Sequence, residues 1–117
     1  MKVRGLLIDP FKPFCDFIEV EDKLDTYYEM LSCDLIEIHE FKVGDKLYTF
    51  VCDEEAAIRP IEKRATYVGN MATLLNAIFV CKCSNGNLKS LSKFDERYLN
   101  DHIRRYGSGA ILMDMEP

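Results

Sequence analysis

The stretch AIFVCKCSNG, residues 77–86, decides the expected fold. It contains the longest apolar run of the chain, Ala77-Ile78-Phe79-Val80-Cys81, whose β-branched and aromatic side chains are typical of a buried strand. The pair Asn85-Gly86 favours the tight turn of a β-hairpin, and Leu88 begins a short returning strand. The sequence therefore predicts a buried strand that turns back on itself.

Four further strands are predicted upstream, over residues 2–8, 14–21, 35–41 and 47–52. The second and third alternate between apolar and polar side chains, which indicates strands with one wet face. The fourth reads LYTFVC and is rich in residues that favour strands. The turn at residues 43–46 joins the last two, so they are expected to form an antiparallel hairpin.

Two helices are predicted. The first begins near Asp22, which is expected to cap it, and its apolar stripe is Leu24, Tyr27, Tyr28 and Leu31. The second is expected to begin at Ser92, whose spacing to Asp95 approximates a capping box, and to run to Tyr106. Gly107 is a suitable stop. Residues 56–76 are expected to be irregular, because Pro60 blocks a continuous helix.

This order of elements predicts an α+β fold with a mostly antiparallel sheet of about five strands and two helices. A chain of 117 residues corresponds to one domain, here residues 1–106. The remainder, residues 107–117, is expected to be a C-terminal tail that is either flexible or docked on the domain.

Composition excludes several classes of protein. Hydrophobic residues make up 48% and charged residues 30%, which argues against a disordered acidic chain, a collagen-like repeat or a coiled coil. The net charge of −5 argues against general nucleic-acid binding. No apolar run resembles a signal peptide or a membrane span, so a cytoplasmic protein without a membrane partner is expected.

The five cysteines favour reduced thiols that pack as small hydrophobes, since their number is odd and no secretion signal is expected. A zinc site at Cys81 and Cys83 is the alternative, but no second cysteine pair is present to complete it. His39 and His102 are candidate acid–base groups, although a hydrogen-bonded structural histidine is commoner. No cofactor, no metal and no catalytic residue are predicted.

Three segments resemble a family of small uncharacterised domains found in phages, plasmids and conjugative elements, chiefly of Gram-positive bacteria. They are the opening strand at residues 1–10, the segment Cys52-Asp53-Glu54-Glu55-Ala56 with Pro60-Ile61-Glu62-Lys63-Arg64, and residues 78–92 with Ser90-Leu91-Ser92. The family pattern has Gly where Ala56 stands and Asn where Lys63 stands. The resemblance implies a fold and a mobile-element habitat, in which anti-defence functions are common, but no reaction.

The acidic residues are unevenly distributed. Residues 16–40 hold nine acidic residues and one basic residue, a net charge of −8. If they share one face, that face would attract a host protein with a basic surface, such as a defence nuclease. This non-enzymatic, partner-binding role is the leading hypothesis. A homodimer of the chain is compatible with it. The residues expected to bind the partner are Glu19, Glu21, Asp22, Asp25, Glu29 and Glu37.

A second hypothesis is a small-ligand module of nucleotide-binding type. Arginine suits a bidentate contact to a phosphate or a carboxylate, and the segment after the fourth strand combines arginines with acids. The ligand-binding residues under this alternative are Asp53, Glu54, Glu55, Arg59 and Arg64. An enzyme of unrecognised type is the third hypothesis. If the segment that carries these residues has no function, it is expected to be a solvated turn with local ion pairs.

Overall fold

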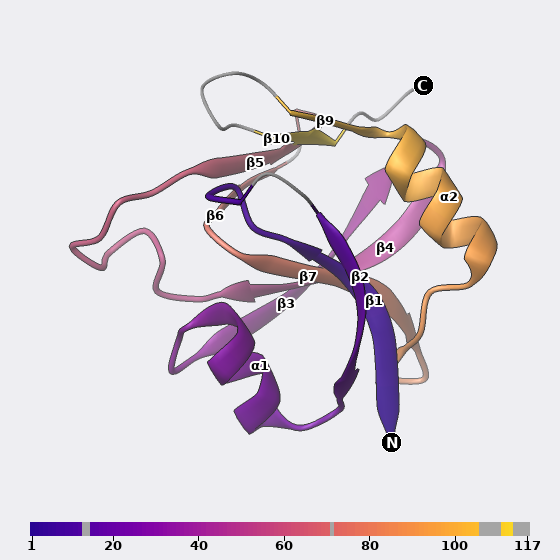
Figure 1. Cartoon of the computed structure of the whole chain (residues 1–117), viewed down its shortest axis with the longest axis horizontal. Helices are drawn as coiled ribbons and strands as arrows, with labels where there is room; N and C mark the ends of the chain where they lie inside the picture. The colour runs from indigo at the N-terminus through magenta and orange to yellow at the C-terminus, as the bar shows by residue number, and fades with distance from the viewer. Residues whose placement is uncertain (13–14, 71, 106–110, 114–117) are drawn as a thin grey trace.

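The computed structural model describes residues 1–12, 15–70, 72–105 and 111–113 (Figure 1). Its helices and strands follow one another in the order below. They are β1 (Lys2–Ile8), β2 (Asp16–Glu21), α1 (Leu24–Leu31), β3 (Ile36–Val43), β4 (Lys46–Asp53), β5 (Ala65–Val68), β6 (Ala72–Leu75), β7 (Ile78–Ser84), β8 (Asn87–Lys89), α2 (Lys93–Asp101), β9 (Ile103–Arg105) and β10 (Ile111–Met113).

The larger sheet has β7 at its centre. Its strand order is β2-β1-β7-β4-β3, with β8 paired to the far end of β7, and every pair is antiparallel. Phe79 lies opposite Leu7 of β1 and Val51 of β4. The predicted hairpin is present, and Asn85 and Gly86 both take the left-handed backbone conformation that such a turn requires.

Side chains of β7 alternate between two separate cores. Ile78 and Val80 belong to the core on one face of the sheet, and Phe79 and Cys81 to the core on the other. All four side chains are fully buried. Strands of antiparallel sheets commonly have one face exposed to solvent. Strand β7 differs because both faces of the sheet are covered at its position.

Helix α1 covers one face. It connects the two edge strands β2 and β3 and places Tyr27 and Leu31 in the same core as Phe79. The Tyr27 and Phe79 rings lie 5.9 Å apart. Because α1 has only eight residues, it leaves several apolar side chains of this core half-buried, among them Leu7, Ile18, Met30 and Ala77.

Helix α2 and the smaller sheet, of strand order β6-β5-β10-β9, cover the other face, so α1 and α2 lie on opposite sides of the molecule (Figure 1). Leu99 of α2 and Val68 of β5 share a core with Phe50 of β4. The predicted capping box is confirmed: the Ser92 hydroxyl accepts from the Asp95 N–H, and the Asp95 carboxylate accepts from the Ser92 N–H.

The Asp95 carboxylate also anchors α2 to the sheet. It accepts a hydrogen bond from the Tyr48 hydroxyl at 2.9 Å and lies 3.5 Å from the Lys82 ammonium. Burial alone would raise its pKa, but the hydrogen bonds from Ser92 and Tyr48 outweigh burial, and the pKa of Asp95 lies below its ordinary value.

The α+β class and the mostly antiparallel sheet are confirmed, and several details differ from the predictions. The larger sheet agrees with the predicted number of about five strands, having five in its main order and β8 as a sixth, but the second, four-stranded sheet was not predicted. Residues 56–76, expected to be irregular, contain β5 and β6. Asp22 does not cap α1; its carboxylate accepts from the Tyr27 hydroxyl, and Lys23 holds the cap position.

The second helix is shorter than predicted. It ends at Asp101, because Asn100 and Asp101 have low helix propensity and the following residues pair as β9 with β10. Strand β10 in turn pairs with β5 in parallel. Residues 111–113 of the expected tail therefore belong to a sheet, whereas Tyr106, Gly107 and the rest of the tail lie outside the described residues. No helix in the part of the chain described here is long and apolar enough to cross a membrane.

Replacing Gly5 by Ala is expected to cost about 3 kcal/mol of unfolding free energy, measured by chemical denaturation. A Cβ at this position would overlap the Phe79 ring and come within 2.6 Å of the Val80 carbonyl oxygen. Gly86→Ala is the control, because a Cβ there meets nothing within 4 Å and the penalty comes from the positive φ alone, about 1 kcal/mol. Equal losses in the two variants would show that close packing of Phe79 on β1 does not constrain the fold.

Asp95→Asn is expected to lower the unfolding free energy at pH 7 by about 1–2 kcal/mol, since it removes the charge that Ser92, Tyr48 and Lys82 stabilise. A carboxyl group with a lowered folded pKa stabilises the fold above its unfolded pKa, near 3.9, and stops doing so as the pH falls through the folded value. The difference between variant and wild type should therefore shrink as the pH falls below about 4. Asp34→Asn, at an exposed turn, should change little at any pH. A pH-independent difference for Asp95→Asn would contradict the assignment.

Candidate functional site

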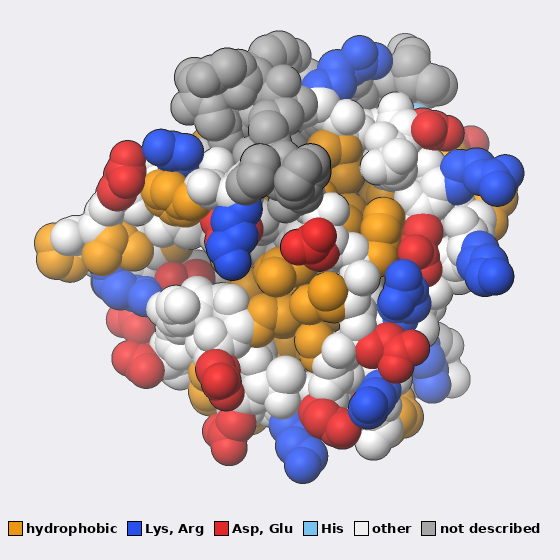
Figure 2. Space-filling view, viewed as in Figure 1, with side chains coloured by type: hydrophobic (Ala, Val, Ile, Leu, Met, Phe, Trp, Pro, Cys, Tyr) orange, Lys and Arg blue, Asp and Glu red, His pale blue; other side chains and the backbone are white. Residues whose placement is uncertain are grey.

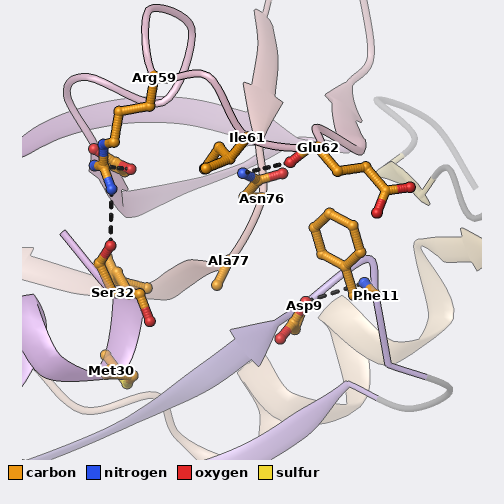
Figure 3. A pocket seen from close by; sticks show the side chains of 11 residues that line it. Asp9, Phe11, Met30, Ser32, Arg59, Ile61, Glu62, Asn76 and Ala77 are labelled. Atoms are coloured by element: carbon orange, nitrogen blue, oxygen red, sulfur yellow. Dashed lines mark hydrogen bonds and ion pairs between the residues drawn. The ribbon is translucent and has the colours of Figure 1, made fainter.

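A cavity of about 230 Å³ lies at one end of the larger sheet (Figure 3). Strands β1 and β4 run in the same direction, and both pair with β7, which runs the opposite way. Their last residues therefore flank the first residues of β7. The end of α1 and the segment between β4 and β5 complete the wall. The lining residues are Asp9, Phe11, Met30, Leu31, Ser32, Asp53, Arg59, Ile61, Glu62, Asn76 and Ala77.

An ion pair between a buried carboxylate and a partly exposed guanidinium closes one end of the cavity. Asp53 is the last residue of β4, and its carboxylate pairs with the Arg59 guanidinium. The same guanidinium donates to the Ser32 carbonyl oxygen at 2.9 Å, which ties the segment after β4 to the end of α1. Asp53 also accepts from the Glu55 N–H at 2.9 Å. Its carboxylate is thus fully engaged, and the pair leaves no net charge at this end.

The opposite end is built around Asn76, the residue two positions before β7. Asn76 has a positive φ of 62°, its side-chain oxygen accepts from the Arg64 N–H at 3.0 Å, and its own N–H donates to the Arg64 carbonyl at 2.8 Å. The Arg64 guanidinium lies over the Phe11 ring, 4.7 Å from its centroid, and donates to the Pro10 carbonyl at 3.5 Å. These contacts hold the segment before β5 against the turn after β1.

Only part of the predicted ligand-binding cluster meets at this cavity. Asp53 and Arg59 line it, and Arg64 lies immediately behind Phe11. Glu54 lines a separate cavity of about 100 Å³, together with Glu37 of β3. The Glu55 side chain lines neither cavity; its contribution is the N–H that Asp53 accepts. The structure therefore brings three of the five predicted residues together.

The six acidic residues expected to bind a partner do not gather on one face. Glu19 and Glu21 lie on edge strand β2, and Glu37 lies on β3, the opposite edge of the sheet. Asp25 and Glu29 project from α1 into solvent. Figure 2 shows acidic and basic side chains interspersed on the face it presents, around a hydrophobic patch.

Several of these acids have local partners. Glu21 lies 3.9 Å from the N-terminal ammonium, and the Glu37 carboxylate lies 3.3 Å from the His39 ring. Asp22 accepts from the Tyr27 hydroxyl. Local pairing of this kind is also what a solvated surface shows, and exposed pairs contribute about 0–1 kcal/mol each.

Sequence reasoning missed nine of the lining residues, namely Asp9, Phe11, Met30, Leu31, Ser32, Ile61, Glu62, Asn76 and Ala77. The pair Asp9-Pro10 was recognisable as a turn, but nothing in the sequence places that turn beside a segment more than 50 residues later. Asn76 carried a usable signal, since an Asn just before a buried strand is one of the few residues that readily takes the left-handed conformation.

The cysteines and histidines lie elsewhere. Burial raises the pKa of the Cys52 and Cys81 thiols to about 12, so both stay protonated at neutral pH. His102 is buried at the end of α2, with Nδ1 2.6 Å from the Tyr98 carbonyl oxygen. Within the described ranges, no three His, Cys, Asp or Glu side chains are grouped so that they would hold a metal ion.

Comparison with known proteins places the chain in a family. The family model for a domain of unknown function, DUF3846, matches residues 1–104. Searches of curated proteins and of solved structures found no match. The match covers nearly the whole of the predicted domain and confirms the expected relationship to a family of uncharacterised domains. On this match, the chain belongs to the DUF3846 family of domains of unknown function.

Proposed function

We propose that this domain is a small-ligand binding module and that its site is the cavity at the shared end of β1, β4 and β7. The observation that carries the proposal is the cavity itself, about 230 Å³, with apolar walls between two polar ends. Ligand sites are typically concave and mostly apolar, with a few polar groups that fix orientation. This volume is below the roughly 300–1,000 Å³ of drug-sized sites, so the ligand is small.

The contacts that frame the cavity support a preformed site. Its walls come from five separate segments, and hydrogen bonds join those segments to one another. Arg59 connects the end of β4 with the end of α1, and Asn76 connects the start of β7 with the segment before β5. A site that is held open before binding avoids the cost of ordering its walls when the ligand arrives.

Binding of a basic host protein, with an anti-defence role in a phage or another mobile element, stays a prediction. It depends on an acidic surface, and the six acidic residues named for it lie on α1, beside it and at both edges of the sheet. The cavity, by contrast, is lined by two residues of the alternative hypothesis, Asp53 and Arg59, and a third, Arg64, lies over the Phe11 ring at its other end. The geometry therefore favours the small-ligand hypothesis.

Ala77→Phe is expected to abolish ligand binding, because the larger side chain would fill the cavity that Ala77 lines. The measurement is a thermal-shift screen of nucleosides, nucleotides, amino acids and aliphatic amines against wild type and variant. A ligand at 100 times its dissociation constant stabilises the folded state by about 2.7 kcal/mol, which raises the melting temperature by several degrees.

Ala57→Phe serves as the matched control, since Ala57 is exposed and does not line this cavity. The proposal expects at least one compound class to stabilise the wild type and Ala57→Phe but not Ala77→Phe. The proposal is wrong if no class stabilises the wild type, or if the stabilisation persists in an Ala77→Phe variant that still unfolds cooperatively.

A further inference from the structure

We infer that the ligand of this cavity carries an alkylammonium group, as in an aliphatic amine or a lysine side chain. The inference rests on the proposed binding function and specifies its chemistry. It departs from the nucleotide-type ligand predicted from the sequence, because the arginines on which that prediction relied are already engaged.

The charges that line the cavity are the first step. Three acidic residues line it, Asp9, Asp53 and Glu62, against one basic residue, Arg59. The Asp53–Arg59 ion pair has no net charge, and the Arg59 guanidinium also donates a hydrogen bond to the Ser32 carbonyl oxygen. The Glu62 side chain is mostly exposed, and its carboxylate lies 3.8 Å from the Arg64 guanidinium. Of the charges along the lining, the Asp9 carboxylate therefore stands outside these two pairs, and a phosphate entering the cavity would meet no uncommitted cation among these lining residues.

The position of Arg64 is the second step. It lies behind Phe11, with its guanidinium over the ring and donating to the Pro10 carbonyl, and it is 3.8 Å from the Glu62 carboxylate. Arg64 thus offsets part of the negative charge but does not line the cavity. Its guanidinium holds the Phe11 ring in place and does not offer a free pair of N–H donors to a ligand.

The shape of the free end is the third step. One Asp9 oxygen accepts from the Phe11 N–H at 3.0 Å, which fixes this carboxylate beside the ring. In Figure 3, Asp9, Phe11 and Glu62 lie at one end of the cavity, and Arg59 and Ser32 lie at the other. The Glu62 carboxylate points away from the cavity in this view, so the Asp9 carboxylate is the group at this end that offers charge pairing to an ammonium group.

The wall between the ends is the fourth step. Ile61, Ala77 and Met30 line the cavity with apolar surface. An aliphatic stem buried against such surface gains about 25 cal/mol per Å² removed from water. An ammonium group on a short unbranched chain satisfies both the acidic end and the apolar wall, whereas a bare cation would leave the wall uncovered.

Isothermal titration calorimetry with pentylamine and with 1-pentanol tests the inference, because the two probes share the chain and differ in charge. Pentylamine is expected to bind the wild type about tenfold or more tightly than pentanol. Asp9→Asn should remove that preference, since Asn retains the oxygen that accepts from the Phe11 N–H while the charge is lost. Glu55→Gln, which removes a carboxylate outside the cavity, is the control and should leave the preference unchanged.

Two further probes separate the sources of the ammonium group. Cadaverine represents a free diamine, and Nα-acetyl-lysine methylamide represents a lysine side chain in a protein; tighter binding of either supports the inference and names the source. Equal affinities for pentylamine and pentanol would overturn it. So would binding of adenosine monophosphate, blocked by Ala77→Phe, with no binding of the amines; that outcome would leave the proposed binding function standing.

Discussion

The packing of the Phe79 ring over Gly5 is the contact on which the rest of the structure depends. Phe79 lies in the central strand of the larger sheet, and β1 can pair beside it only because residue 5 has no side chain. Tyr27 of α1 packs against this Phe79 ring. On the opposite face, Ile78 and Val80 require the cover of α2 and the smaller sheet. Both outer layers therefore follow from one strand that is buried on both sides.

The same central strand also places the cavity. Because β7 runs against both β1 and β4, its first residues stand between the last residues of those strands. Chain segments leave or enter the sheet at this end, and the end of α1 and the segment after β4 line the space between their turns. The side chains at these turns are polar, so a cavity with charged ends and an apolar middle results.

Local patterns predicted the elements that local sequence determines. The apolar run at residues 77–83, the Asn85-Gly86 turn and the Ser92–Asp95 capping box all appear in the structure, since each depends on a few neighbouring residues. The end of α2 and the strand β10 did not follow, because they depend on pairing with the distant β5. Asp53 and Arg59 could be named from the sequence because they are close along the chain. Asp9 and Asn76 could not, since only the strand order brings them there.

The acidic residues show how a pattern that is local in the sequence is spread out by the fold. They are close together in the sequence, and that closeness favoured a single acidic face. The segment that carries them crosses from one edge of the sheet to the other through α1, so neighbours along the chain become distant in space. Charge density along a sequence predicts a surface only when the topology keeps the segment on one side of the molecule.

The most direct test of the binding site is a titration of the ¹⁵N-labelled domain with pentylamine, followed by amide chemical shifts. It asks whether the cavity at this end of the sheet binds the ligand. Saturable shifts are expected at Asp9, Phe11, Ser32, Glu62 and Ala77, with little change in β8 or along the exposed side of α2. Saturable shifts confined to the acidic residues of α1 and β2, or no saturable shifts at the cavity, would contradict the assignment of this cavity as the binding site.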